Sequence, residues 1–151
     1  VFTGDKSSDF LYKCLFNANI SNQSTSDHVN DGLKIKNAFI TPALKCVPPE
    51  DKPLKVELDN CFKFFNNELN ILKNLKVVVA LGKIAFDTCK IFYSKKFEIP
   101  KYVKFQHGKS FKLKNGVNLV GCYHPSPRNV NTGRINEKMM TKLFLKVKKL
   151  D

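Results

Sequence analysis

The segment from His124 to Arg134 combines a titratable side chain with a stiff, basic loop. It reads His-Pro-Ser-Pro-Arg-Asn-Val-Asn-Thr-Gly-Arg, and it holds the only two arginines of a chain with 26 basic residues. The planar guanidinium of arginine binds phosphate or stacks on a base, which the point charge of lysine does less well. Proline and glycine restrict the backbone, and histidine can exchange a proton near neutral pH. The segment therefore predicts a loop that binds a polyanion beside a proton-donating group.

Within this loop, His124 is expected to follow a strand. An imidazole in that position can hydrogen-bond an oxygen on which negative charge develops, although it could also be a structural histidine that caps the turn. Arg128 and Asn129 lie at the loop tip, where they could enter a groove, clamp phosphates or form a solvated turn. The residues 132–134 precede a predicted helix, whose exposed amides favour a phosphate.

Residues elsewhere in the chain could take part in the same chemistry. Asp5 follows Thr-Gly, and a carboxylate held on a tight turn can orient a water molecule for attack. Aspartate is also common in turns and helix N-caps, so Asp5 alone is not diagnostic. Phe2 could stack on a base or belong to the core. Cys46 and Cys61 are candidate metal ligands, but two thiolates cannot complete a four-ligand site, and buried thiols are the alternative.

Composition limits the classes of function. With 151 residues and 42% hydrophobic residues, the chain is expected to fold as one domain. No apolar run approaches the ~18 residues that span a bilayer. The net charge of +13 favours a nucleic-acid or anionic-lipid partner, although an AT-rich genome would also enrich lysine and asparagine. Five cysteines, an odd number, predict free thiols in a reducing cytoplasm or metal ligands rather than disulfides.

The spacing of apolar residues predicts an alternation of helices and strands. Helices are expected over 6–19, 54–72, 83–93 and 137–150. Strands are expected over 35–44, 76–82, 110–113 and 117–123, the last two joined by a hairpin at Asn115-Gly116. This order predicts an α/β fold with a central, mostly parallel sheet flanked by helices. Ligands of such sheets bind beyond the carboxyl ends of strands, here after Leu44, Gly82 and Tyr123.

Taken together, these segments resemble the uracil-DNA glycosylase superfamily, in particular its iron–sulfur families four and five, and family five ("type b") most of all. The resemblance covers essentially the whole chain, and the combination of blocks is specific although no single block is. The blocks follow the family order: Phe2–Asp5 with Ser8–Leu11, Ile40-Thr41, Lys45–Pro49, Lys52-Pro53, Cys61, Val79–Gly82 with Ala85-Phe86, Phe105–Gly108, His124–Asn129 and Thr132–Arg134. Pro42 stands where family four tends to have an asparagine, which favours family five and a looser pocket.

The resemblance implies a three-layer α/β/α fold and a DNA repair hydrolase that flips out and excises uracil. The looser pocket of family five would extend this to hypoxanthine or other deaminated bases. By analogy, Asp5 would orient the attacking water, His124 would hydrogen-bond the leaving base, and Phe2 would stack on that base. Cys46 and Cys61 would be two of the four ligands of a structural 4Fe–4S cluster. The DNA would be held by Pro125, Ser126, Arg128, Asn129, Thr132, Gly133 and Arg134.

The chain also departs from the family pattern. An upstream Cys-x-x-Cys pair and a Gly-Leu-Ala-Pro-like strand are absent. We therefore expect residues 1–151 to form a single domain that lacks its N-terminal strand and first ligand pair and cannot hold a complete cluster by itself. The expected partner is DNA with deaminated bases, bound by a monomer in a prokaryotic cytoplasm, with no membrane involved.

Other functions remain open at this stage. The chain could be a non-catalytic basic nucleic-acid-binding module or an inactive truncated homologue, because both would keep the basic face. A nucleotide-binding enzyme that uses the end of the strand at Leu81-Gly82 is disfavoured, since the sequence has no glycine-rich phosphate loop and no Walker-type Lys-Ser/Thr.

Overall fold

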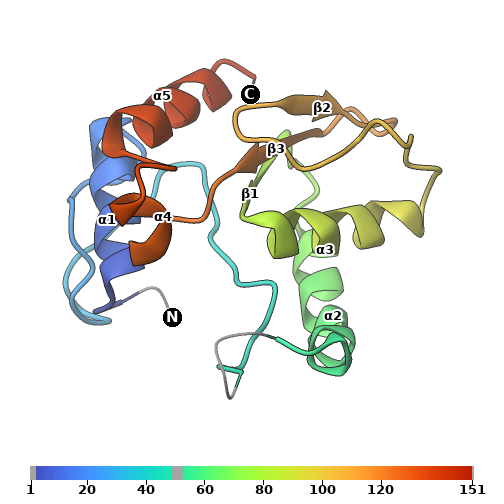
Figure 1. Cartoon of the computed structure of the whole chain (residues 1–151), viewed down its shortest axis with the longest axis horizontal. Coiled ribbons are helices and arrows are strands. Elements are labelled where there is room, and N and C mark those ends of the chain that lie inside the picture. The colour runs from blue at the N-terminus through green and yellow to red at the C-terminus, as the bar shows by residue number, and fades with distance from the viewer. Residues whose placement is uncertain (1–2, 49–52, 151) are drawn as a thin grey trace.

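The computed structural model describes residues 3–48 and 53–150, which form helices on both sides of a small sheet (Figure 1). Phe2 lies outside the described residues. The elements are α1 (Lys6–Asn17), α2 (Lys55–Ile71), β1 (Val77–Leu81), α3 (Lys83–Ser94), β2 (Ser110–Lys112), β3 (Asn118–Cys122), α4 (Pro127–Asn131) and α5 (Glu137–Val147). The four long helices and the strands β1, β2 and β3 agree with the segments expected from the sequence, to within a few residues at their ends.

The three strands have the order β1-β3-β2. β1 pairs with β3 in parallel, with Leu81 opposite Cys122, and β2 pairs with β3 antiparallel through the predicted hairpin. The α/β prediction is therefore confirmed, and the sheet is mixed. Because β1 and β3 run in parallel, their carboxyl ends lie at the same edge of the sheet. The chain leaves β1 at Gly82 and β3 at Tyr123, so both Gly82 and His124 lie at that edge.

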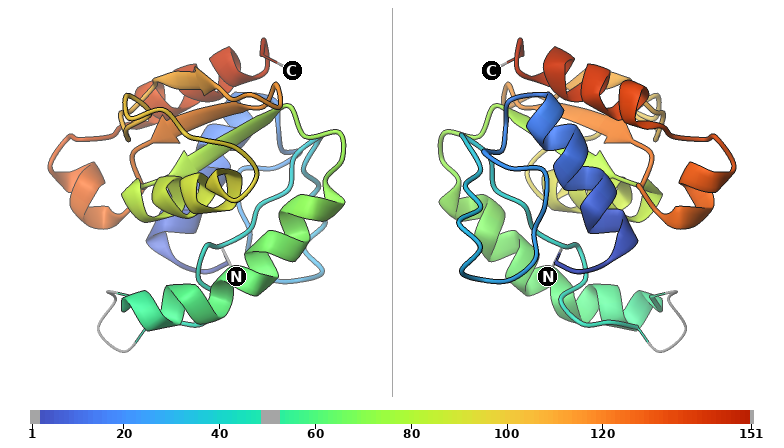
Figure 2. Two further views of the ribbon diagram at one scale, coloured as in Figure 1. Left: turned by 90° about the vertical axis from the view of Figure 1, so that its right-hand side faces the viewer. Right: turned by 90° about the vertical axis from the view of Figure 1, so that its left-hand side faces the viewer.

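Side chains alternate between the two faces of the sheet, and each face has its own core. Val120 and Cys122 belong to a cluster with buried residues of α1 and α5: Leu11, Cys14, Leu15, Met140, Leu143 and Phe144. Ala80 and Leu119 belong to the opposite cluster, with α2 and α3: Phe65, Leu69, Phe86, Cys89, Phe92 and Tyr93. The two views of Figure 2 show α1 and α3 on opposite faces of the sheet, which agrees with the expected three layers.

The strand predicted over residues 35–44 is wrong. Of this segment, the structure gives only Ile35 a bridge, to Ser21. Farther along, Thr41 and Lys45 instead bind Glu68 of α2 through their side chains. The segment is thus fixed by side-chain contacts with a helix rather than by a strand ladder, and its end does not supply the third strand exit expected after Leu44.

The predicted loop over 124–134 contains one short helix, α4. Pro127 occupies its first turn, where proline is well tolerated, and the Ser126 hydroxyl accepts a hydrogen bond from the Asn129 amide at 3.5 Å. The loop is therefore more regular than expected. Five helical residues were too few to produce a hydrophobic periodicity in the sequence.

Candidate active site

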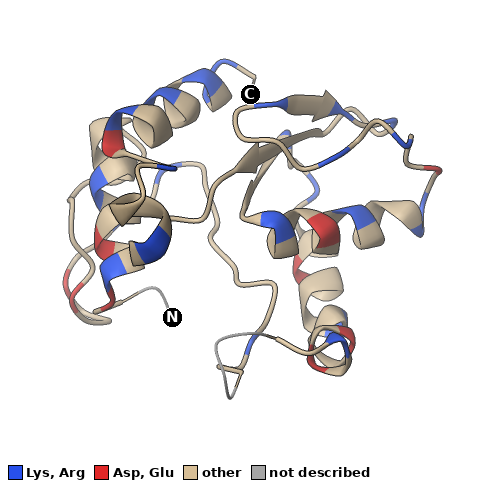
Figure 3. Cartoon of the chain, in the orientation of Figure 1, with Lys and Arg blue, Asp and Glu red and all other residues tan. Residues whose placement is uncertain are grey.

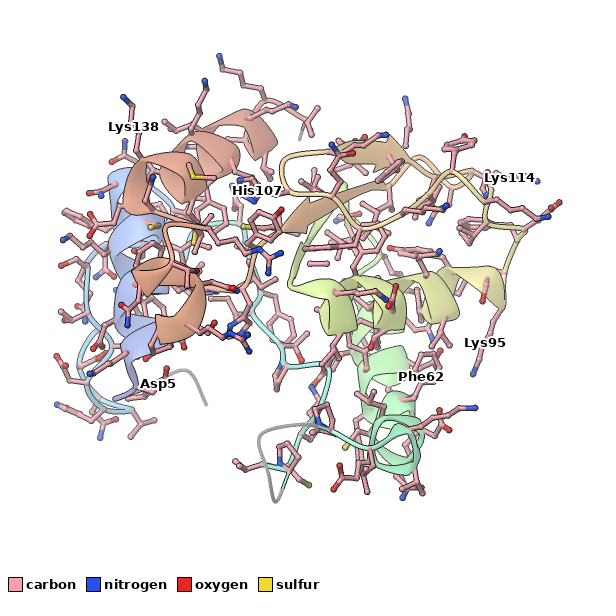
Figure 4. All side chains as sticks on the ribbon, viewed as in Figure 1. Asp5, Phe62, Lys95, His107, Lys114 and Lys138 are labelled. Carbon is pink, nitrogen blue, oxygen red and sulfur yellow. The ribbon has the colours of Figure 1, made fainter. Side chains whose placement is uncertain are left out.

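A pocket of about 170 Å³ lies between the start of α1 and the carboxyl ends of β1 and β3. Asp5 and His124, which come from opposite ends of the chain, both line it. Figure 4 labels Asp5 at the start of α1. The remaining lining residues are Ser7, Leu11, Leu81 and Pro125. The structure thus brings the two residues predicted to be catalytic to one cavity with largely apolar walls.

Asp5 is the N-cap of α1. Its Oδ1 atom accepts hydrogen bonds from the amides of Ser7 at 2.8 Å and Ser8 at 2.9 Å, and the Ser8 hydroxyl accepts one from the Asp5 amide at 3.2 Å. Within the described part of the chain, its Oδ2 atom has no hydrogen-bond partner. One carboxylate oxygen is therefore fixed by the helix, while the other can accept a hydrogen bond from water. The N-cap interpretation and the catalytic one are thus compatible.

His124 is positioned by the backbone of two neighbouring segments. The Gly82 amide donates to the Cys122 carbonyl at 2.7 Å, which joins the two strand exits. The Asn129 side-chain amide donates to the His124 carbonyl at 2.9 Å, so the loop closes back on the residue that begins it. Because Pro125 is buried directly after it, the backbone at His124 is held from both sides.

The protein around His124 affects its ionisation. Its side chain keeps an exposed surface at the pocket, yet burial of the ring lowers its pKa from the ordinary 6.5, and the nearby charge of Asp5 opposes this shift only in part. This shift favours the neutral form of the imidazole. A neutral imidazole can donate an N–H hydrogen bond to an oxygen without adding a full positive charge to the pocket.

Most of the loop residues predicted to bind DNA hold the loop together. Ser126 caps α4, Asn129 binds the His124 carbonyl, and the Thr132 hydroxyl donates to the Arg128 carbonyl at 2.8 Å. Gly133 has a φ of 69°, which favours glycine. At the next helix, Asn136 already accepts a hydrogen bond from the Met139 amide at 2.9 Å. Contacts of these residues with DNA remain predictions.

The two arginines have different surroundings. Arg128 is exposed on α4. The guanidinium of Arg134 lies over the Tyr123 ring at 5.0 Å from its centroid, and His107 stacks on the same ring at 4.9 Å with an interplanar angle of 6°. The Tyr123 amide also donates to His107 Nδ1 at 3.1 Å. Arg134 is therefore held by an aromatic stack, whereas Arg128 is free to reach outward.

Cys46 and Cys61 lie where α2 meets the segment before residue 48. Cys61 is 7% exposed, and its sulfur accepts a hydrogen bond from the Lys45 amide at 3.4 Å, while Cys46 is exposed. A buried sulfur with an amide donor beside an exposed thiol fits two ligands of an iron–sulfur cluster. Across residues 3–48 and 53–150, no group of three or more potential ligands could hold a metal ion. The other cysteines, Cys14, Cys89 and Cys122, are buried in the cores.

Positive charge covers much of the surface. Figure 3 shows lysine and arginine on α3, α4, α5 and the β2 hairpin, with fewer acidic residues between them. In the described ranges, only three lysines form ion pairs with carboxylates. None of the helices there is both long enough and apolar enough to cross a bilayer. The unpaired lysines suit a polyanionic ligand such as DNA.

Sequence reasoning did not identify several residues that build the site. The sequence predicts Gly82 at the end of a strand, but it does not indicate that Gly82 lies beside His124. Asn129 was expected to contact DNA rather than the His124 carbonyl. The contacts of the Tyr123 ring with Arg134 and His107 have no signal in the local sequence, since these residues are distant from one another along the chain. The position of Gly82 between an apolar strand and a helix is the one sequence feature that indicates a close approach of another group to its backbone.

Comparison with known proteins identifies the family of the chain. The family model described as the uracil DNA glycosylase superfamily matches residues 1–148, so the chain belongs to that superfamily. Three similar curated proteins are each named type-5 uracil-DNA glycosylase, which confirms the resemblance to family five. That of Thermus thermophilus is 35% identical over 150 residues, that of Mycobacterium tuberculosis 36% over 151, and that of Pyrobaculum aerophilum 35% over 145.

The matches cover nearly all of this chain but not all of the relatives. They include 99%, 99% and 95% of the chain, and 66%, 56% and 61% of the Thermus, Mycobacterium and Pyrobaculum proteins, respectively. The chain therefore spans less than two thirds of the length of these relatives.

Proposed function

We propose that this chain provides the catalytic centre of a DNA repair glycosylase that removes uracil by hydrolysis of the N-glycosidic bond. The observation that carries the proposal is the single pocket lined by both Asp5 and His124. A base inside a duplex is inaccessible, so the nucleotide must first be flipped out at a cost of a few kcal/mol. The apolar walls at Leu11, Leu81 and Pro125 suit the flat faces of an extruded base.

The proposed reaction divides the work between the two polar residues. The oxygen of a water molecule bonds to C1′ of the deoxyribose as the C1′–N bond breaks, and the bonding electrons leave with the base. The free Oδ2 of Asp5 orients this water and accepts its proton, and the carboxylate charge stabilises the developing positive sugar. His124 donates a hydrogen bond to the oxygen of the base on which negative charge develops. The base leaves as an anion and takes up a proton from solvent, Asp5 returns its proton to solvent, and the products are the neutral base and an abasic site.

Binding of DNA is assigned to the segment that begins at His124. Arg128 reaches outward from α4, and Arg134 is oriented by Tyr123, so both guanidinium groups can meet phosphates near the pocket. The excess of unpaired lysine adds affinity that depends on salt concentration. We further propose that the protein acts as a monomer in a reducing cytoplasm, in keeping with its five free cysteines.

We also assign Cys46 and Cys61 to a 4Fe–4S cluster, as two of its four ligands. Such a cluster would have a structural role, tying the segment before residue 48 to α2. The buried sulfur of Cys61 and its amide donor support this assignment. The other two ligands would have to come from outside residues 1–151, because the remaining cysteines of this chain are buried in its cores.

Single-turnover assays of the full-length protein test the function. Oligonucleotides that carry one uracil, one hypoxanthine or only normal bases are incubated with excess protein, and abasic sites are revealed by alkaline cleavage. We expect excision of uracil, and of hypoxanthine if the pocket is as loose as Pro42 suggests. Binding without excision would support a non-catalytic nucleic-acid-binding module instead. Neither binding nor excision would identify an inactive homologue.

A further inference from the structure

Three side chains outside the pocket form a compact ionic cluster, here called the 41/45/68 clamp: Thr41, Lys45 and Glu68. The Lys45 ammonium donates to both carboxylate oxygens of Glu68, at 2.8 and 2.7 Å. The Thr41 hydroxyl donates to Glu68 Oε2 at 2.6 Å and accepts from the Lys45 ammonium. Every member of the clamp therefore contacts the other two. The proposed reaction uses none of them.

The clamp is better shielded from solvent than the other ion pairs of the described residues. The side chains of Lys45 and Glu68 are 22% and 31% exposed, whereas those of Lys83 and Asp87, an ion pair within α3, are 74% and 43% exposed. Fully exposed pairs contribute little to stability because water screens them. The four mutual hydrogen bonds and partial burial give the clamp a fixed geometry that a lone surface pair lacks.

Lys45 links the clamp to both cysteines. Its backbone amide donates to the Cys61 sulfur at 3.4 Å, and its side chain binds Glu68, which lies seven residues farther along α2. Residues seven apart occupy the same face of a helix. Lys45 is therefore attached to that face at two points, two turns apart. Cys46 is the next residue, so its position relative to Cys61 is set by these two attachments.

We propose that the 41/45/68 clamp is the device that holds Cys46 beside Cys61 for the iron–sulfur cluster. The inference rests on the proposed cluster, and it names residues that act through the ligands rather than as ligands. The segment over 41–46 has no strand ladder to fix it, so side-chain contacts must do so. The side chains of Thr41 and Lys45 both bind Glu68, which fixes the five-residue segment 41–45 at its two ends. The Lys45 amide then donates to the Cys61 sulfur. Loss of the clamp would release Cys46 without removing a ligand.

The test uses full-length protein purified without oxygen, in its wild-type form and with Glu68→Gln or Lys45→Met. Iron and acid-labile sulfide per chain are measured, followed by the rate of iron loss to a chelator. Changes around metal ligands typically cost 10- to 100-fold in metal affinity, so we expect iron loss to be at least about 10-fold faster in both variants. Asp87→Asn, which breaks the exposed pair of α3, is the matched control and should leave the rate unchanged.

A second variant separates positioning from a general loss of folding. The exchange Lys45→Glu with Glu68→Lys restores an ion pair of reversed polarity and should recover slow iron loss, while each half of it alone should not. Thermal unfolding of every variant is followed in parallel, and rates are compared below the onset of unfolding. Thr41→Val, which removes one hydrogen bond, should have an intermediate effect.

The outcomes distinguish this inference from the proposed function. If wild-type protein contains iron and sulfide but the clamp variants retain them as well as the control, the clamp has no role in positioning. If the wild-type protein contains neither, both the cluster and the clamp proposal fall. Excision of uracil is scored separately, so a failure of either proposal leaves the assignment of Asp5 and His124 to be judged on its own.

Discussion

A Cβ atom on Gly82 would lie 3.3 Å from the Cβ atom of His124. This close approach follows from the parallel pairing of β1 with β3, which brings the two strand exits together. Gly82 also has a φ of 96°, a conformation that side chains other than glycine rarely adopt. The histidine is thus packed against a bare stretch of backbone, which fixes where its ring can enter the pocket.

Gly82→Ala should lower the excision rate by more than its loss of folding stability alone would cause. The strained φ should cost about 1–2 kcal/mol of unfolding free energy, and the added methyl group should displace His124. The shift needed is a few tenths of an ångström, so the rate should fall by less than the roughly 100-fold that a misplacement of 1 Å can cause. Gly116→Ala is the control, since Gly116 has a φ of 86° with no atom near its Cβ position. Urea denaturation should show similar losses of stability for Gly82→Ala and Gly116→Ala, whereas Gly116→Ala should keep the wild-type rate of single-turnover excision. Equal excision rates for the two variants would contradict the packing role of Gly82.

His124→Ala should reduce single-turnover excision by about 100- to 1000-fold, the usual effect of removing one donor to a developing negative charge. Because the side chain keeps an exposed surface at the pocket, its removal should affect folding little. His28→Ala, which alters an exposed histidine of the loop before residue 35, should excise uracil at the wild-type rate. An unchanged rate for His124→Ala would remove this residue from the mechanism.

Asp5→Asn should separate the two uses of this side chain. Asparagine is as good an N-cap as aspartate, so the hydrogen bonds to Ser7 and Ser8 should persist and stability should change by less than about 1 kcal/mol. The charge that orients water and stabilises the sugar is lost, so excision should fall steeply. Asp5→Ala should lose roughly 1 kcal/mol in addition, from the cap. Were Asp5→Asn as active as wild type, Asp5 would be a structural cap alone.

Arg128→Ala should weaken DNA binding and make it less dependent on salt. Each phosphate contact contributes about −0.9 to the slope of log affinity against log salt concentration. Fluorescence anisotropy of a labelled duplex at several salt concentrations measures this slope. Arg128→Lys keeps the charge and should retain the slope, although it loses the planar fork. Identical slopes for Arg128→Ala and wild type would mean that Arg128 does not contact phosphate.

Stability should fall as the pH drops below about 6.5. Burial lowers the pKa of both His107 and His124 from 6.5, so the unfolded chain takes up protons at a higher pH than the folded chain does. The free energy of unfolding therefore decreases with falling pH through this range. Urea denaturation between pH 7.5 and 5 measures the trend. His107→Asn keeps an acceptor for the Tyr123 amide and should flatten the curve, while a curve as steep as that of wild type would exclude His107 as a contributor.

Helices and strands with clear periodicity were predictable from the sequence. α1, α3 and α5 each bury one face, and the apolar run before Gly82 forms β1 as expected. The segment 35–44 was wrongly predicted as a strand because its composition suits one. Whether such a segment joins a sheet depends on a free strand edge nearby, which its own composition does not indicate. Its actual contact, Glu68, lies 27 residues beyond Thr41 and could not be inferred from local pattern.

The site was only partly predictable. The residues that follow His124 indicate a functional role for it. Asp5 is an ordinary N-cap by local sequence, and only the family resemblance places it in the same site as His124. The proximity of Gly82 to His124 depends on the register of β1 with β3, which the sequence does not specify. Asn129 was assigned to DNA because it is polar and at a loop tip; its bond to the His124 carbonyl depends on the helical turn of α4, which was not expected.

The contact between the first and last helices links the order of synthesis to the moment at which the pocket forms. α1, which carries Asp5 at its start, packs against α5, and Lys13 pairs with Glu137 at 2.8 Å while Lys148 donates to the Ala18 carbonyl at 3.0 Å. These partners are separated by most of the polypeptide, and such non-local contacts form late in folding. A nascent chain that still lacks α5 can pack α1 only against the face of the sheet, without the helix that covers much of its apolar side. The pocket between α1 and the strand ends is consequently expected to be completed only when translation of this region is almost finished.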